Sequence, residues 1–246
     1  MSSNPDRYQR KIKLILLLSL TLNIFFSIAV IHHLKKSGGF TFLKMKLSGQ
    51  IVRPSAHESN YYIMKLSSFY AMPSDASQTV IFGNSIADYC DWAEIMENPL
   101  IVNRGIGGDN ITGMAKRVGQ ITASSPGKVF IMLDSKDFNL KTPHDTITNC
   151  YNRIIDTLLL KTPGSEIFCT SILPVNVQIF NLEEIKEINK KLEELAARKG
   201  INYIDLSDVI CDENFDIKKQ YTFNGVYLNG EGFKAIADVL NRYIKE

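Results

Sequence analysis

"TVIFGNSI", residues Thr79–Ile86, joins a short apolar run to a turn that contains glycine and then to the start of a predicted helix. Similar apolar runs recur along the rest of the chain, each followed by a turn. Strands that alternate with helices in this way indicate βαβ units and a parallel sheet that is covered on both faces. The five predicted strands are "TVIF" (79–82), "LIVN" (100–103), "KVFIML" (128–133), "EIFCTS" (166–171) and "INYID" (201–205).

The helices expected around these strands make the fold an α/β fold and locate the loops that matter for function. Ligands of an open parallel sheet bind outside the carboxyl ends of the strands. The functional residues should therefore lie in the loops directly after each strand. The helices are expected at about Ile86–Glu97, Asn110–Thr122, His144–Leu160, Leu182–Lys199 and Gly230–Ile244.

Ser85 stands in the turn between the first strand and its helix. A helix N-terminus offers free N–H groups and partial positive charge, which stabilise an anion. A serine hydroxyl there could attack a carbonyl carbon, and the backbone N–H of the serine could help to hold the oxyanion. A serine that only caps the helix explains the same residue, because Ser is a favoured N-cap.

A glycine cluster follows the second strand, with Gly105, Gly107 and Gly108 ahead of a predicted helix. Glycine lets the backbone approach a ligand closely or adopt a positive φ. A tight loop explains the cluster equally well, and the spacing is not that of a dinucleotide-binding fingerprint.

Seven stretches of the region Thr79–Ile244, in their order and spacing, resemble the SGNH (GDSL-type) hydrolases. The nearest likeness is to platelet-activating-factor acetylhydrolase-like extracytoplasmic bacterial esterases. The resemblance implies a flavodoxin-like three-layer α/β/α sandwich, which agrees with the five-stranded parallel sheet, and it implies serine ester hydrolysis. The stretches are "IFGNSI", "VNRGIGGDNITG", "KVFIMLDSKDF", "SILPVN", "IKEINKKLEELA", "YIDL" and "YTFNGVYLNGEGF".

The first two motifs keep the family's chemistry. Ser85 matches the family's nucleophile, and Asn84 stands where many members have Asp. Gly108 matches the glycine whose N–H contributes to the oxyanion hole. On the resemblance, these two loops are those of an acyl-transfer enzyme.

The last two motifs depart from the family. The third motif is normally Gly-x-Asn-Asp, but here Asp134 replaces the glycine and Lys136 replaces the oxyanion asparagine. The last motif is normally Asp-x-x-His, but here Asn224 replaces the aspartate and Tyr227 replaces the catalytic histidine. An ordinary phenol is protonated at pH 7 and is a poor base for a serine.

Two hypotheses follow from these replacements. In the first, the domain has lost hydrolysis and binds an acylated glycan or lipid, or contacts another envelope protein. In the second, it remains an active esterase that removes acetyl or other acyl groups from a lipid or glycan, with Lys136 or His144 as a new base. We prefer the first hypothesis because Lys136, Asn224 and Tyr227 depart from the family's chemistry together. The neighbouring Asp134 and Asp137 also favour the charged form of Lys136, which is not a base.

The N-terminal region contains an uncharged run of 18 residues, Leu14–Ile31. Such a helix is about 27 Å long, which is close to the thickness of the hydrocarbon core. The basic residues before it favour a cytoplasmic N-terminus and place the rest of the chain outside the cytoplasm, on the periplasmic or cell-surface side. A signal peptide cleaved near Ser27–Ala29 and a buried helix are the alternatives, but the apolar run is long for a signal peptide.

We expect four segments, with the membrane as one partner of the chain. Apolar residues at helical spacing, Tyr62, Leu66 and Phe69, predict a helix that docks on the main domain. The segments are an N-terminal tail (1–12), a transmembrane signal anchor (13–34), a linker with the docking helix (35–77) and a hydrolase-like domain (78–246).

The composition argues against other functions. The formal net charge is +2 and no basic patch is interleaved with aromatic residues, so a nucleic-acid partner is not expected. The scattered cysteines do not form a metal-binding pattern, and the motifs imply neither a metal nor a cofactor. Four cysteines allow three pairings, although buried free thiols are the preferred interpretation. The cysteines are Cys90, Cys150, Cys169 and Cys211.

Overall fold

The chain forms two compact units, Met1–Arg53 and Pro54–Glu246. The computed structural model describes part of the first unit and most of the second, and the greater part of the expected linker at 35–77 lies outside the described residues. The described residues are 5–36, 59–72, 74–123, 125–139, 142–174 and 182–245.

The first unit contains one long helix, α1 (Pro5–Lys36). Within it, the stretch Gln9–His32 is long and apolar enough to cross a membrane, and none of it is buried. A helix of 24 residues is about 36 Å long, enough to span a hydrocarbon core of about 30 Å. A membrane anchor and an N-terminal signal sequence share these properties.

The second unit is built on the predicted five-stranded sheet, and all of its strand pairs are parallel. The strand order is β2-β1-β3-β4-β5. This is the flavodoxin-like order that the family resemblance implied. The strands are β1 (Thr79–Gly83), β2 (Ile101–Gly105), β3 (Lys128–Met132), β4 (Glu166–Thr170) and β5 (Asn202–Ile204).

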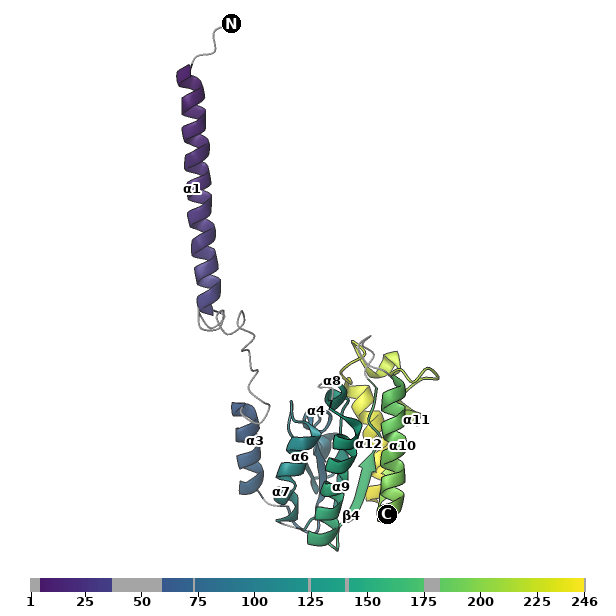
Figure 1. Cartoon of the computed structure of the whole chain (residues 1–246). Coiled ribbons are helices and arrows are strands. Elements are labelled where there is room, and N and C mark those ends of the chain that lie inside the picture. Colours follow the sequence, from purple (N-terminus) through teal and green to yellow (C-terminus); the bar gives the residue numbers. More distant parts are fainter. Residues whose placement is uncertain are drawn as a thin grey trace. The chain divides into compact units, whose positions relative to one another are not determined.

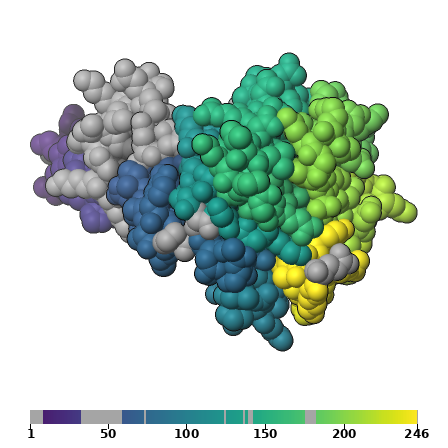
Figure 2. Space-filling model, turned by 90° about the horizontal axis from the view of Figure 1, so that it is seen from below, coloured from purple at the N-terminus to yellow at the C-terminus, as the bar shows by residue number. Residues whose placement is uncertain are grey.

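Two hydrophobic clusters, one on each face of the sheet, make the unit a three-layer sandwich. Along β1, Val80 and Phe82 face the first cluster and Ile81 faces the second. Helices α6, α9 and α10 pack on the first face, and α5, α11 and α12 pack on the second. Figure 2 shows the C-terminal helix α12, in yellow, beside the blue-to-teal segment that contains α5; there the rings of Trp92 and Phe233 meet at 5.9 Å.

The helices of the second unit largely follow the predicted ranges. Their bounds are α3 (Asn60–Ala71), α4 (Ser85–Asp88), α5 (Trp92–Ile95), α6 (Ile111–Arg117), α7 (Gly119–Thr122), α8 (Lys136–Asn139), α9 (His144–Lys161), α10 (Leu182–Lys199), α11 (Ser207–Ile210), η2 (Lys219–Tyr221) and α12 (Gly230–Ile244).

The expectation of one helix over Ile86–Glu97 was wrong, because α4 ends at Asp88 and α5 begins at Trp92. The carbonyl of Ala87 accepts hydrogen bonds from the Trp92 indole (2.8 Å) and the Asn103 amide (2.7 Å). In a continuing helix, the Ala87 carbonyl would instead accept from the N–H four residues later. The two side-chain donors therefore replace that helical bond. The helix expected at Asn110–Thr122 is likewise divided, into α6 and α7.

The four cysteines are free. Cys90, Cys169 and Cys211 are buried, and Cys150 is partly buried. Burial raises the pKa of the Cys169 thiol to about 12. The thiols therefore act as small hydrophobic side chains.

Candidate active site

Ser85 and Gly108, the predicted nucleophile and oxyanion residues, lie together at the carboxyl edge of the sheet. Ser85 begins α4 directly after β1, and its residue is only 9% exposed. The N–H of Gly108 donates to the Ser85 Oγ at 3.0 Å. Gly108 has a φ of 84°, a conformation that favours glycine. The geometry thus places a backbone donor directly on the serine hydroxyl.

Asp88 holds the glycine loop in place, and the sequence reasoning missed it. Its carboxylate is 2% exposed and pairs with Lys65 at 2.6 Å. It also accepts hydrogen bonds from the Gly107 N–H (2.6 Å) and the Tyr61 hydroxyl (2.5 Å). Because Tyr61 and Lys65 belong to α3, this one carboxylate ties the docking helix to the loop beside Ser85.

A buried ion pair between Arg117 and Asp109 also holds the loop that contains Gly108. The Arg117 Nε lies 2.7 Å from an Asp109 carboxylate oxygen, and both side chains are essentially inaccessible to solvent. Arg117 also donates to the carbonyls of Gly83 (2.6 Å) and Arg104 (2.8 Å), at the ends of β1 and β2. Burial lowers the pKa of the Arg117 guanidinium, and the charge of Asp109 opposes that shift. The pair therefore joins two strand ends to the residue that follows Gly108.

Asn84 and Asp134 explain each other's departure from the family pattern. The Asn84 amide donates to an Asp134 carboxylate oxygen at 2.8 Å, and the Asp134 N–H donates to the Asn84 Oδ1 at 3.0 Å. Asn84 is completely buried. An aspartate at position 84 would place two carboxylates in contact, so Asn84 suits a chain that carries Asp134.

We expect Asn84→Asp to lower the free energy of unfolding at pH 7 by about 2–3 kcal/mol, because it removes a buried donor and adds a like charge. Adding Asp134→Asn exchanges the two side chains and should restore most of the loss. Guanidinium unfolding of both variants measures the coupling. Equal stability of Asn84→Asp and the natural chain would show that the two side chains are not coupled.

Asp137 stabilises the start of α6 and does not face solvent. Its carboxylate accepts from the Ile111 N–H at 3.0 Å and from the Thr142 hydroxyl at 3.2 Å. Burial raises its pKa to about 6, although these hydrogen bonds oppose the rise. Asp137 is therefore a buried acceptor for the first N–H of α6.

The raised pKa makes Asp137 a source of pH-dependent stability. The folded state binds the proton more tightly, so this contribution is complete below the unfolded pKa of 3.8 and is lost as the pH rises through about 6. Between pH 4 and pH 7 we expect the natural chain to lose about 2–3 kcal/mol relative to Asp137→Asn. Unfolding curves of both proteins at each pH test this; parallel pH profiles would contradict it.

Lys136 is the first residue of α8, directly after the loop that holds Asp134. Its side chain lies outside the described residues. The predicted roles of Lys136, as the oxyanion replacement or as a base for Ser85, therefore stay predictions. Its backbone position places it at the carboxyl edge of the sheet, in the loop that follows β3.

The last motif forms its own turn. The Asn224 Oδ1 accepts hydrogen bonds from the N–H groups of Val226 and Tyr227, each at 3.0 Å. The Tyr227 carbonyl accepts from the Thr222 hydroxyl at 2.7 Å. Asn224, predicted to stand in place of the family's aspartate, thus uses its side-chain oxygen to shape the loop.

Tyr89 stands between the predicted nucleophile and the last motif, and the sequence reasoning also missed it. Its ring lies 6.0 Å from the Tyr227 ring. Burial raises the pKa of Tyr89, and a side-chain hydrogen bond with Ser85 opposes that rise. Tyr89 follows Ser85 by four residues, a spacing that places two side chains on one face of a helix and could have revealed it.

These contacts bring together Ser85, Gly108, Tyr89 and Tyr227. Among the described side chains, they include no base for the serine. Tyr89 is a neutral phenol at neutral pH, since its pKa is raised. His144, the alternative base, contacts the Phe138 ring at 5.9 Å and lies 4.0 Å from Glu184. The described contacts therefore place polar groups around Ser85 but do not identify a group that takes its proton.

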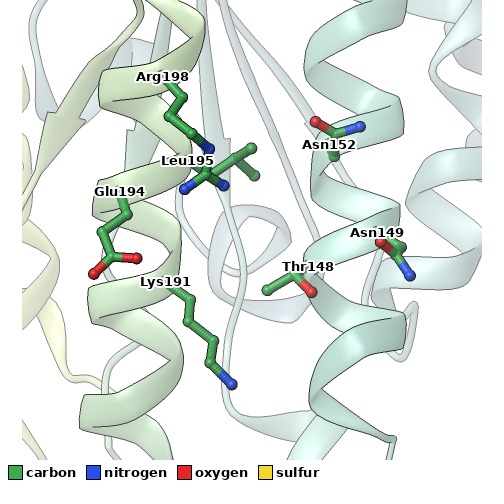
Figure 3. A pocket seen from close by; sticks show the side chains of 7 residues that line it. All are labelled: Thr148, Asn149, Asn152, Lys191, Glu194, Leu195 and Arg198. Atoms are coloured by element: carbon green, nitrogen blue, oxygen red, sulfur yellow. The ribbon is translucent and has the colours of Figure 1, made fainter.

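The described part of the second unit also has hollows away from Ser85, two of which border α10. The larger, of about 330 Å³, lies between α9 and α10 (Figure 3), and the smaller, of about 200 Å³, borders α10 and β5. The linings of both hollows are free of the predicted site residues. Among the described residues, no group of three or more His, Cys, Asp or Glu side chains could hold a metal ion. The larger hollow is lined by Thr148, Asn149, Asn152, Lys191, Glu194, Leu195 and Arg198.

Comparison with known proteins supports the same family. The model of the GDSL-like lipase/acylhydrolase family matches residues 81–235. No curated protein matches the sequence.

Solved structures share the fold at low identity. One, provisionally described as a platelet activating factor from Streptococcus pneumonia, is 22% identical and has a TM-score of 0.70, covering 83% of this chain and 99% of its own. A GDSL-like lipase from Bacteroides thetaiotaomicron is 20% identical, with a TM-score of 0.65 and coverage of 76% and 97%. The lipase/acylhydrolase from Enterococcus faecalis is 19% identical, with a TM-score of 0.59 and coverage of 68% and 95%. At these identities the likeness shows the fold alone.

Proposed function

Because this chain belongs to the GDSL-like lipase/acylhydrolase family, we propose that it is a membrane-anchored member whose site binds a ligand without hydrolysing it. The site keeps the serine and its backbone donor, Ser85 and Gly108, at 3.0 Å. It lacks the two side chains that would activate the serine. The domain would thus use a hydrolase fold for binding.

The contacts of Asn224 and Tyr227 in the last motif are the main support for the loss of hydrolysis. Asn224 takes the place of the orienting aspartate, and its oxygen is occupied by two backbone N–H groups of its own turn. Tyr227 takes the place of the general base, and its half-exposed ring packs near Tyr89. If no other side chain replaces the histidine as base, the serine hydroxyl keeps its proton and remains a weak nucleophile.

We further propose an acylated glycan or lipid, or an envelope protein, as the ligand. An acyl carbonyl could accept from the Gly108 N–H that now bonds the Ser85 hydroxyl. The apolar α1 supports a single-pass anchor. The basic residues that precede its apolar stretch support placement of residues 78–246 outside the cytoplasm.

The second candidate function is a working esterase with a rewired base. The contact between Gly108 and Ser85 favours it, because an oxyanion donor next to the nucleophile is the arrangement that acyl transfer needs. Lys136 follows β3 at the same edge of the sheet and is the residue that we would assign as the base.

A fluorophosphonate probe distinguishes the two functions, because it reacts with an activated serine. We expect the full chain in detergent to remain unlabelled from neutral to alkaline pH. Labelling that disappears in Ser85→Ala would support the esterase, and its further loss in Lys136→Met would identify the base. Labelling that persists in Ser85→Ala would be non-specific and would leave the proposed function standing.

A further inference from the structure

Helix α3 has two apolar faces, of which the protein covers one. Tyr62 and Phe69 on the inner face are buried against Ile106, with Leu66 packed beside them. The other face looks away from the unit, at whose edge α3 lies (Figure 1). A surface helix normally turns charged and polar residues to the outside. The outer face of α3 departs from that pattern.

Exposed apolar side chains concentrate on this helix. Five of the eleven exposed large hydrophobic side chains described in the second unit lie on α3 or at its C-cap. A protein surface carries single exposed hydrophobic residues without consequence, but a cluster of them marks a contact surface. Tyr61 is one of the five, but it turns its hydroxyl to the buried Asp88 carboxylate of the domain. We call the other four side chains the outer face of α3: Ile63, Met64, Tyr70 and Met72.

The outer face of α3 carries no charge. Lys65 is the one charged residue in the helix, and it pairs with the buried Asp88 carboxylate at 2.6 Å. The charge that could have kept the outer face in water is therefore directed toward the body of the unit. This ion pair explains how an otherwise uncharged helix is held against the domain.

The two serine hydroxyls of α3 donate to the backbone of the helix itself. The hydroxyls of Ser67 and Ser68 both donate to the Met64 carbonyl, at 2.8 and 2.9 Å. On α1, Thr21 makes the same kind of bond to the Leu18 carbonyl at 2.9 Å. Bonds of this kind satisfy a hydroxyl without water, which suits a helix surface in contact with lipid.

We propose that the outer face of α3 lies on the lipid surface, in the boundary between head groups and acyl chains. Apolar side chains of interfacial helices enter this boundary to a depth of about 5–10 Å. Tyr70 suits that depth, because tyrosine is enriched at membrane interfaces. The inference rests on the membrane anchor of the proposed function and does not depend on whether Ser85 is reactive.

The chain keeps α3 within reach of such a surface. The 23 residues between the end of α1 and the start of α3 can span at most about 80 Å when fully extended. An anchored α1 would therefore hold α3 at a high effective concentration next to the bilayer. A weak apolar contact is sufficient under that condition.

A second copy of the chain is a less suitable partner than lipid. The helix has 12 residues and is about 18 Å long and about 10 Å wide, which gives a face of about 200 Å². A stable protein–protein interface needs about 800 Å² from each partner. Lipid needs no such area, because the anchor already supplies most of the attachment.

Tryptophan quenching by brominated lipid tests the contact in the full chain. We would compare Ile63→Trp with Leu160→Trp, a control that is 75% exposed on α9; both keep the fully buried Trp92 as background. Phosphatidylcholine brominated high on the acyl chain should remove about half of the added Ile63→Trp emission, given the depth of interfacial helices. The control should lose little.

The outcomes separate the inference from the anchor. A chain that floats with liposomes and resists carbonate extraction, but shows equal quenching of Ile63→Trp and Leu160→Trp, overturns the lipid contact and leaves the anchor intact. A chain that does not float overturns the anchor and the contact together. Protection of Ile63→Trp from quenching, with a doubled particle mass in nanodiscs, would instead assign the outer face of α3 to a second copy.

Discussion

Lys136→Asn, Asn224→Asp and Tyr227→His, introduced together, should give the chain Ser85-dependent ester hydrolysis, at least about 100-fold above the natural rate. The imidazole would supply the missing general base, and the carboxylate would orient it. The loop should accept the change, since an aspartate at position 224 can take the two N–H bonds that Asn224 now accepts. Initial rates with p-nitrophenyl acetate measure the effect.

Two matched variants make the gain interpretable. The triple variant with Ser85→Ala should return to the background rate, which would assign the hydrolysis to the serine. Lys136→Asn alone should remain inactive, because it adds an oxyanion donor without a base. A triple variant that folds normally but hydrolyses no faster than the natural chain would show that the scaffold itself has lost the catalytic geometry.

Arg117→Met should destabilise the protein by about 3–5 kcal/mol, the largest loss of stability that we expect from one substitution. It leaves the Asp109 carboxylate buried without its 2.7 Å partner and removes two donors from the ends of β1 and β2. Guanidinium unfolding at pH 7 measures the loss.

A surface pair provides the control for this experiment. Lys186 and Glu183 are 2.8 Å apart and exposed. Lys186→Met should therefore change stability by less than about 1 kcal/mol. Arg117→Met with Asp109→Leu should recover part of the loss, because no unpaired buried charge remains. A loss for Arg117→Met as small as that for Lys186→Met would contradict the account of the buried pair.

The strands were predictable from sequence because the central ones are buried on both faces. Runs such as "TVIF" and "KVFIML" are apolar at successive residues, and in β1 and β3 these side chains reach both hydrophobic clusters. The strand order has no such local signal. It came from the family resemblance, since periodicity states what each segment forms but not which segments pair.

The sequence predicted where the site residues lie, but not which side chains they contact. The motifs located Ser85 and Gly108 because their loops follow β1 and β2. The break after α4 depends on Asn103, which is 16 residues from Ala87 in sequence, so no local pattern could indicate it. Asp88 was missed for the same reason, because its partners lie on α3 and in the loop after β2.

The contact between Asn84 and Asp134 gives a physical reason for two residues that differ from the family pattern. In the sequence, Asn84 and Asp134 are two separate departures from the family pattern. In the structure they are one reciprocal pair of hydrogen bonds, at 2.8 and 3.0 Å. Positions 50 residues apart cannot be recognised as a pair from a single sequence without the fold.

The most direct test of the central claim is the hydrolysis of short-chain p-nitrophenyl esters by the natural full chain and by Ser85→Ala, measured side by side. The account predicts equal background rates for the two proteins, because Asn224 and Tyr227 provide no base for the serine. Turnover by the natural chain that disappears in Ser85→Ala would contradict the account and establish a working esterase.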